Sequence, residues 1–198
     1  CLITEETSYM HIPVPLKGEH QAKNCALALA AVNQLEKMSY AIDELSTYNS
    51  LAQTNVKGRM EMICHRPRIL VDGAHNPSSL TTLMKAIGAH IPYDSMVCVF
   101  GCCQDKDVEG MLKRVGLGAD KIIFTKAKGN QRAASPKVLQ KTFAEQSGKM
   151  TQIADTLEEA LEIAAQAASR EDLICVTGSF YLVGEAKKYI KKLEANRN

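Results

Sequence analysis

Apolar residues in the second part of the chain fall into short unbroken runs instead of alternating with polar residues. Examples are Ile69-Leu70-Val71, MVCVF at residues 96–100 and LICVT at residues 173–177. Unbroken apolar runs of this length are typical of strands that are covered on both faces, as in a parallel sheet. Strands are predicted at about 59–64, 68–72, 96–100, 121–125, 150–154 and 173–177.

The segments between these runs carry apolar residues at helical spacing. Helices are predicted near 78–90, 107–115, 135–147, 157–168 and 180–195. Only a short turn at Arg66-Pro67 separates the first two strands, so these should be antiparallel, whereas the other four connections contain helices. The pattern predicts an α/β fold, with a doubly wound, mostly parallel six-stranded sheet.

The first part of the chain has a different pattern. A strand is predicted near residues 9–14, followed by a helix over about 19–37 that is rich in small residues and a short helix capped by Asp43. One strand with two helices is too little to form an independent core. Residues 1–55 are therefore expected to be the incomplete end of a larger domain, and residues 56–198 a complete domain.

Charge, hydropathy and cysteine usage restrict the class of protein. The net charge of +2 does not suggest a nucleic-acid surface. No apolar stretch approaches the roughly 20 residues of a membrane span, and the N-terminal CLITEETSYM does not resemble a signal peptide. The seven cysteines include no C-x-x-C pair, and Cys102-Cys103 lacks neighbouring ligands at metal-site spacing. We expect a cytoplasmic protein with no metal site of its own.

The stretch DGAHNP at residues 72–77 follows one of the predicted strands. Asn76 and Pro77 suit the start of a helix, as N-cap and first-turn residue, so Asp72 and His75 should lie in a strand-to-helix loop. Open α/β sheets bind their ligands at this carboxyl edge. The alternative is an aspartate that only accepts hydrogen bonds from loop amides. Both side chains are expected to be accessible to solvent until a partner domain closes over them.

Two further stretches precede that loop. In GEHQAKN, residues 18–24, His20 and Asn24 share one helical face, where Asn24 could pair with a purine edge; the alternative is ordinary polarity at a helix start. In VKGRMEM, residues 56–62, Arg59 follows a glycine and suits a bidentate contact with phosphate, although surface arginines are common and the stretch by itself favours that alternative.

The last stretch is TGSFYLVGEA at residues 177–186. Ser179 follows Gly178 at a strand end, where a hydroxyl and helix N-terminal amides could hold a carboxylate; the alternative is a plain N-cap. No G-x-x-x-x-G-K-[ST] phosphate loop occurs in the chain, and Gly116-Leu117-Gly118 precedes a strand, unlike a dinucleotide fingerprint. The chain therefore carries no phosphate-binding loop of its own.

Several motifs occur in one order along the chain: G-x-H-Q-x-x-N-x-x-x-A, G-R-x-E, D-G-A-H-N-P, the D-K-D of 105–107, the R-A-A-S-P of 132–136 and G-S-F-Y-L-V-G-E-A. In order and spacing the chain resembles the folylpolyglutamate synthase and dihydrofolate synthase branch of the Mur ligase superfamily. The resemblance likens residues 1–55 to the tail of the central ATPase domain and residues 56–198 to the Rossmann-like C-terminal domain. Lys57 stands where this family usually has proline, which loosens the hinge but leaves Arg59 in place.

The resemblance implies an ATP- and Mg²⁺-dependent amide ligase. Such an enzyme activates a carboxylate of dihydropteroate, a reduced folate, or both, as an acyl phosphate, and the amino group of L-glutamate then attacks it. By the same resemblance Asn24 contacts adenine with His20 nearby, Arg59 the nucleotide phosphates and Asp72 the ribose. His75 and Ser179 lie near the acyl phosphate and the incoming glutamate, and His75 and Asp72 are the catalytic residues.

The resemblance also implies what the chain lacks. The phosphate loop and the magnesium ligands belong to an N-terminal half, so this chain is expected to be inactive alone and to act in a monomeric enzyme with that half, without nucleic acid or membrane partners. An alternative is a stand-alone α/β module that binds a nucleotide or amino acid without catalysis. A purely structural role has little support, since no repeat or long apolar surface pattern is present.

Overall fold

The computed structural model of the chain describes residues 2–3, 8–9, 12 and 14–196. The chain divides into two compact units, Cys1–Lys57 and Gly58–Asn198. This division lies close to the boundary expected from the sequence after residue 55.

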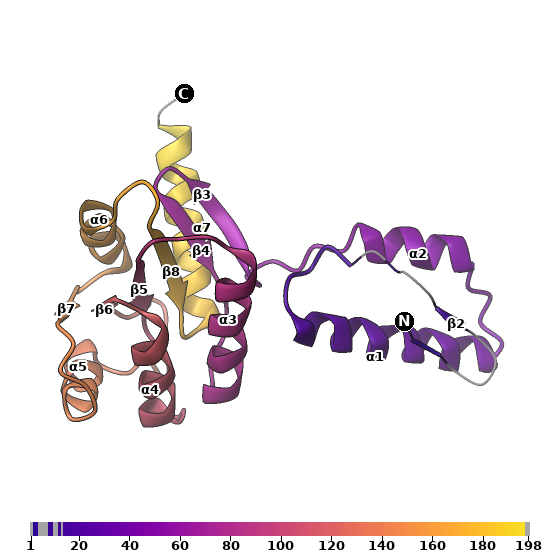
Figure 1. Cartoon of the computed structure of the whole chain (residues 1–198), viewed down its shortest axis with the longest axis horizontal. Helices are drawn as coiled ribbons and strands as arrows, with labels where there is room; N and C mark the ends of the chain where they lie inside the picture. Colours follow the sequence, from indigo (N-terminus) through magenta and orange to yellow (C-terminus); the bar gives the residue numbers. More distant parts are fainter. Residues whose placement is uncertain (1, 4–7, 10–11, 13, 197–198) are drawn as a thin grey trace. The chain divides into compact units, whose positions relative to one another are not determined.

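The larger unit is built on one six-stranded sheet (Figure 1). Its strands are β3 (Glu61–His65), β4 (Arg68–Val71), β5 (Met96–Phe100), β6 (Lys121–Phe124), β7 (Thr151–Ile153) and β8 (Leu173–Thr177). They lie in the order β3-β4-β8-β5-β6-β7. β3 pairs antiparallel with β4, and the four other neighbouring pairs are parallel. The predicted doubly wound, mostly parallel sheet is confirmed.

Helices cover both faces of this sheet. They are α3 (Pro77–His90), α4 (Val108–Gly118), α5 (Pro136–Ala144), α6 (Leu157–Ala167) and α7 (Phe180–Ala195). Leu70 and Phe124 belong to a core shared with α3, α4 and α5, whereas Val71 and Ile123 belong to a core shared with α6 and α7. Successive side chains of a strand point to opposite faces, so a sheet covered on both sides needs an apolar residue at every position. This explains the unbroken apolar runs.

The helices begin where the sequence places polar caps. Asn76, Asp107 and Thr156 each accept a hydrogen bond from a backbone N–H in the first turn of the helix that follows. The predicted ends are less accurate: α5 ends at Ala144, earlier than the expected residue 147. No helix among the described residues is long and apolar enough to cross a membrane.

The strand order brings distant loops together at the carboxyl edge of the sheet. β8 lies between β4 and β5, with Val176 paired to Val71 and Thr177 paired to Phe100. The backbone N–H of Gly178 then donates to the carbonyl oxygen of Ala74 at 3.1 Å. The loops that follow β4 and β8 are therefore joined directly, although about a hundred residues separate them in the chain.

The smaller unit contains α1 (Glu19–Lys37), α2 (Glu44–Ala52) and a two-stranded ladder of β1 (Leu2–Ile3) and β2 (Ser8–Tyr9). The strand predicted over residues 9–14 lies partly outside the described residues. Asp43 caps α2 as predicted, accepting from the Ser46 N–H at 2.7 Å. Among the described residues of this unit, Leu29 is the one buried hydrophobic side chain, in agreement with the expected lack of a core.

Candidate active site

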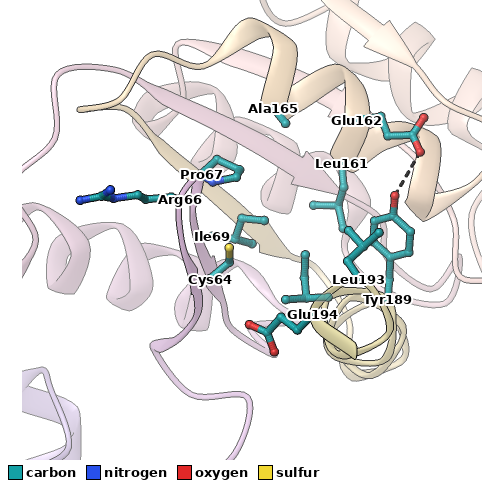
Figure 2. A pocket seen from close by; sticks show the side chains of 11 residues that line it. Cys64, Arg66, Pro67, Ile69, Leu161, Glu162, Ala165, Tyr189, Leu193 and Glu194 are labelled. Carbon is teal, nitrogen blue, oxygen red and sulfur yellow. Dashed lines mark hydrogen bonds between the residues drawn. The ribbon is translucent and has the colours of Figure 1, made fainter. Parts of the chain in front are cut away.

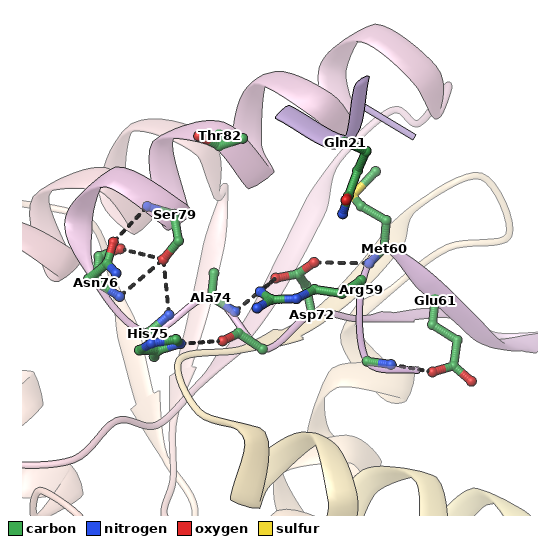
Figure 3. A network of polar contacts seen from close by, with 12 residues as sticks. Gln21, Arg59, Met60, Glu61, Asp72, Ala74, His75, Asn76, Ser79 and Thr82 are labelled. Atoms are coloured by element: carbon green, nitrogen blue, oxygen red, sulfur yellow. Dashed lines mark hydrogen bonds and ion pairs between the residues drawn. The ribbon is translucent and has the colours of Figure 1, made fainter. Parts of the chain in front are cut away.

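Asp72 follows the last residue of β4 and organises the loop that leads to α3. Its Oδ1 accepts the N–H of Ala74 at 2.8 Å and its Oδ2 accepts the N–H of Met60 at 2.9 Å (Figure 3). The Asp72 side chain is only 8% exposed. The expectation that Asp72 is accessible to solvent is therefore wrong, because the carboxylate turns inward to satisfy loop amides. Both oxygens accept hydrogen bonds from loop amides, as the alternative interpretation of this aspartate expects. A contact between Asp72 and ribose stays a prediction.

The amide of Met60 reaches Asp72 through an unusual turn before β3. Gly58 has φ of 71° and Met60 has φ of 46°, a left-handed conformation that costs energy for a residue with a side chain. The turn is held by the Gly58 N–H, which donates to Glu61 Oε2 at 2.6 Å, and by the Gly73 N–H, which donates to the Gly58 carbonyl at 2.9 Å. Backbone strain maintained by such contacts is typical of functional loops.

Arg59 lies within this turn and has two stabilising contacts in the described structure. Its Nη1 lies 3.9 Å from Asp72 Oδ1, which is an ion pair but too long for a good hydrogen bond. Its Cζ lies 4.8 Å from the centroid of the Phe180 ring, within the range of a cation–π interaction. The Arg59 side chain remains 32% exposed, so it is partly accessible to solvent at the carboxyl edge of the sheet.

Phe180 is the site residue that the sequence interpretation missed. It is the first residue of α7, yet 46% of its surface is exposed. Its ring lies 6.1 Å from the imidazole of His75, tilted by 48°. A Cβ on Gly73 would overlap the same ring. The motif around Ser179 is present in the sequence, but an apolar residue after an N-cap gives no sign that it will contact an arginine and a histidine.

One ring nitrogen of His75 makes a hydrogen bond within the loop. Its Nδ1 lies 2.8 Å from the carbonyl oxygen of Gly73. A carbonyl oxygen can only accept, so this contact favours the tautomer with the proton on Nδ1 and leaves Nε2 as an acceptor. Asn76 and Ser79 form a capping box directly after His75, and Pro77 occupies the first turn, as predicted. The base of the loop is thus rigid while one nitrogen of the imidazole is available for chemistry.

Ser179 is the N-cap of α7 and is 6% exposed. Its Oγ accepts a hydrogen bond from the Leu182 N–H at 3.2 Å, so the hydroxyl oxygen acts as an ordinary N-cap. Gly178 before it has φ of +107°, a conformation that residues with a side chain rarely adopt. A Cβ at Gly178 would also overlap the carbonyl of Gly101 at the end of β5. Only glycine therefore allows Ser179 to sit against the loop of Ala74.

His20 and Asn24 belong to the smaller unit, in the first turns of α1. The Nδ2 of Asn24 donates to Gln21 Oε1 at 3.1 Å. His20 is partly buried, and its Nδ1 has no hydrogen-bond partner among the described residues. Their predicted role at the adenine stays a prediction. By contrast, the structure brings Arg59, Asp72 and His75 together within the larger unit.

The described residues include no group of three or more histidine, cysteine or acidic side chains that could hold a metal ion. Of the two adjacent thiols, Cys102 is buried, and this burial raises its pKa to about 12, with smaller contributions from Cys103 and Asp105.

A separate cavity of about 150 Å³ lies at the other end of β4, between the turn that joins β3 to β4 and the helices α6 and α7 (Figure 2). The apolar part of its lining is made by Cys64, Pro67, Ile69, Leu161, Ala165, Ile190 and Leu193. Tyr189 also lines it and donates from its hydroxyl to Glu162 at 3.0 Å. We call this space the amino-end cavity. It contains none of the residues that the sequence motifs single out.

Comparison with known proteins identifies the family of the chain. Residues 58–180 match the family described as Mur ligase, glutamate ligase domain. A dihydrofolate synthase/folylpolyglutamate synthase of Mycobacterium tuberculosis is 29% identical over 90% of this chain and 40% of its own length. A probable bifunctional folylpolyglutamate synthase/dihydropteroate synthase of Halobacterium salinarum is also 29% identical, over 88% of this chain and 20% of its own length.

Solved structures resemble the chain in the same way. Mycobacterium tuberculosis folylpolyglutamate synthase, crystallised in complex with ADP and AMPPCP, matches 92% of this chain and 42% of its own length, with 29% identity and a TM-score of 0.83. An Escherichia coli structure with a TM-score of 0.81 is 24% identical over 99% of this chain and shows the same fold. The chain thus spans less than half of these structures' length.

Proposed function

The chain belongs to the Mur ligase family through its glutamate ligase domain, and we propose that it forms the C-terminal part of an ATP-dependent ligase that adds L-glutamate to dihydropteroate, to folates, or to both. The single observation that supports this most is the meeting of Arg59, Asp72 and His75 at the carboxyl edge of the sheet, where α/β folds bind ligands.

The proposed reaction has two steps. A carboxylate oxygen of the pterin substrate attacks the γ-phosphorus of ATP, which forms an acyl phosphate and releases ADP. The amino nitrogen of glutamate then attacks the acyl carbon, phosphate leaves, and the nitrogen loses a proton as the amide forms. Catalysis of such steps depends mainly on positioning the reactants, stabilising charge and excluding water.

Arg59 is proposed to bind the nucleotide phosphates. Its side chain keeps about a third of its surface exposed and contacts Asp72 and Phe180, so a phosphate could approach it without a large rearrangement. Arginine suits this role because its planar group offers several donors in a fixed geometry. Asp72 is proposed to contact the ribose as well as to hold the turn.

His75 and Ser179 are proposed to lie beside the acyl phosphate and the incoming glutamate. The Nε2 of His75 could accept the proton that the attacking amine loses, because Nδ1 is occupied by the Gly73 carbonyl. Ser179 uses its Oγ as an acceptor within α7, so its hydroxyl hydrogen can be donated to a carboxylate oxygen. The amides at the start of α7 would add to that binding.

The nucleotide and its magnesium ion are proposed to be held partly from outside this chain. The residues described here suit phosphate and ribose but include no carboxylate cluster for Mg²⁺. We therefore expect the metal ligands and the phosphate loop in an N-terminal ATPase half, with Asn24 and His20 facing the adenine. The cysteines among the described residues are free thiols, which suits the cytoplasmic enzyme that we propose. We propose in addition that this enzyme is a monomer.

The alternative is a stand-alone module that binds a nucleotide or amino acid without catalysis. The ligase hypothesis and the binding-module hypothesis predict different behaviour when the chain is joined to an N-terminal ATPase half. Phosphate release would be measured with ATP, Mg²⁺, L-glutamate and dihydropteroate or a reduced folate, for this chain alone and for the chain joined to an N-terminal ATPase half of a relative. We expect no turnover by the chain alone and glutamate-dependent turnover in the joined protein. Turnover by the isolated chain would refute the proposal.

A further inference from the structure

We propose that Phe180 is a positioning residue of this site, which holds the guanidinium of Arg59 and the imidazole of His75 in the orientations that ligation requires. The inference rests on the function proposed above. It assigns a role to a side chain that would touch neither substrate nor metal.

Core packing does not account for Phe180. The residue has 46% of its surface exposed at the start of α7, whereas Leu182 and Val183, which follow within the same turn, are buried in the core with α6. A large aromatic ring at an exposed helix start loses part of the hydrophobic stabilisation that burial would provide. Its position is explained by the two charged or titratable side chains that it contacts.

The contact with Arg59 preserves the properties that phosphate binding needs. The Cζ of Arg59 lies 4.8 Å from the ring centroid, and the distance to the nearest carboxylate oxygen, Oδ1 of Asp72, is 3.9 Å. A second carboxylate at this place would cancel the positive charge and take up N–H donors. An aromatic ring attracts the cation without a negative charge of its own, so the guanidinium stays orientated and able to bind an anion.

The contact with His75 restricts the plane of the imidazole. The Gly73 carbonyl holds Nδ1 at 2.8 Å, but one hydrogen bond still allows the ring to rock about that nitrogen. The Phe180 ring, 6.1 Å away and tilted by 48°, packs against the imidazole and limits this motion. The direction of Nε2 is therefore set by two contacts.

Two glycines provide the space for this ring. A Cβ at Gly73 would overlap the Phe180 ring, and a Cβ at Gly58 would lie 3.3 Å from it. These glycines are near neighbours of His75 and Arg59 respectively, and the Gly73 N–H donates to the Gly58 carbonyl at 2.9 Å. The backbone segments that carry the two functional side chains thus converge on Phe180, which explains how one ring can orientate both.

The test compares Phe180→Leu, which removes the ring but keeps an apolar side chain, with Phe180→Tyr, which keeps the ring. Tyr181→Leu is the matched control, because Tyr181 is the next residue and is 50% exposed. NMR of the chain would record the side-chain resonances of Arg59 and the imidazole of His75, which a nearby ring shifts. We expect these shifts to be lost in Phe180→Leu and kept in Phe180→Tyr and Tyr181→Leu.

The same variants would be assayed in the joined ligase. Phe180→Leu should lower kcat/KM about tenfold, with a raised KM for ATP, while Phe180→Tyr and Tyr181→Leu stay within about twofold of the parent. If Phe180→Leu proves unstable, Phe180→Met takes its place. Unchanged Arg59 and His75 resonances, or an unchanged kcat/KM, in the ringless variant would overturn the proposal. A parent ligase without glutamate-dependent turnover would refute the proposed function instead, while the NMR shifts would still report whether the ring holds the two side chains.

Discussion

The two ends of β4 differ in how their residues are used. At the carboxyl end, Arg59, Asp72, His75 and Phe180 form what we call the Arg59 cluster, in which a carboxylate is buried and an aromatic ring is half exposed. At the amino end, the cavity between the β3–β4 turn, α6 and α7 has an apolar lining with charged groups such as Glu162 at exposed positions.

The residues at the amino end of β4 mainly stabilise the fold, whereas those at its carboxyl end form a candidate site. The amino-end cavity follows the usual rule, with apolar groups inside and charges outside. The Arg59 cluster departs from it, since Met60 adopts a positive φ and the buried Asp72 carboxylate must be compensated by two backbone amides. Local departures of this kind concentrate at functional sites, because the rest of the fold must stabilise them. Variants at the two ends should therefore affect different properties.

Asp72→Ala is expected to have the largest effect, because Asp72 contributes both to the stability of the fold and to the proposed site. It removes the acceptor for the amides of Met60 and Ala74, so the free energy of unfolding should fall by about 2–4 kcal/mol. In the joined ligase kcat/KM should fall by at least about a hundredfold. Thermal unfolding and phosphate release on the same preparation measure both. Asp72→Asn, which retains one acceptor oxygen, is the control and should recover part of the stability. A fully stable Asp72→Ala chain would contradict the role given to the two amides.

His75→Ala should separate activity from stability. We expect kcat/KM to fall by about a hundredfold, near 2.7 kcal/mol of transition-state stabilisation, because the proposed proton acceptor is lost. The melting temperature should change little, since the side chain contributes one hydrogen bond, to the Gly73 carbonyl. His90→Ala, in the exposed last turn of α3, is the matched control. Normal turnover with a lowered melting temperature would leave His75 with only a structural role.

Arg59→Ala should weaken nucleotide binding more than it weakens folding. A charge-assisted contact with phosphate contributes roughly 1.5–3 kcal/mol, so the apparent affinity for ATP should fall about ten- to a hundredfold. Titration of the joined ligase with ATP measures this. Arg68→Ala serves as the control, because Arg68 begins β4 and donates to the Glu171 carbonyl at 3.1 Å. Equal affinity in the Arg59 variant and the parent would remove the phosphate assignment.

Ala165→Phe should have the smallest effect on activity. Ala165 is an exposed residue of α6 at the amino-end cavity, so a larger apolar side chain can cover the lining without entering the core. Filling such a space commonly adds about 0.5–2 kcal/mol to stability. We expect kcat/KM within about twofold of the parent, together with a raised melting temperature. A large loss of turnover would show that the two ends of β4 are not independent.

Much of the architecture could be read from local signals. The apolar runs predicted strands β4, β5, β6 and β8 because a sheet covered on both faces selects apolar residues at consecutive positions. Asn76, Pro77 and Asp43 predicted helix starts because caps satisfy amides within the same turn. The motifs also indicated Arg59, Asp72 and His75, which the structure brings together.

By itself, the sequence therefore determined the strands and the helix starts, since each depends on neighbours a few positions away, and its motifs singled out Arg59, Asp72 and His75 as candidate site residues. Only the tertiary structure decided that β8 lies between β4 and β5 and that the buried Asp72 accepts a hydrogen bond from the Met60 amide. It also decided that Phe180 contacts both Arg59 and His75. These contacts join residues from 12 to more than 100 positions apart. The physical reason is that such contacts form only where the packing of the whole sheet brings loops together, so no local pattern of residues encodes them.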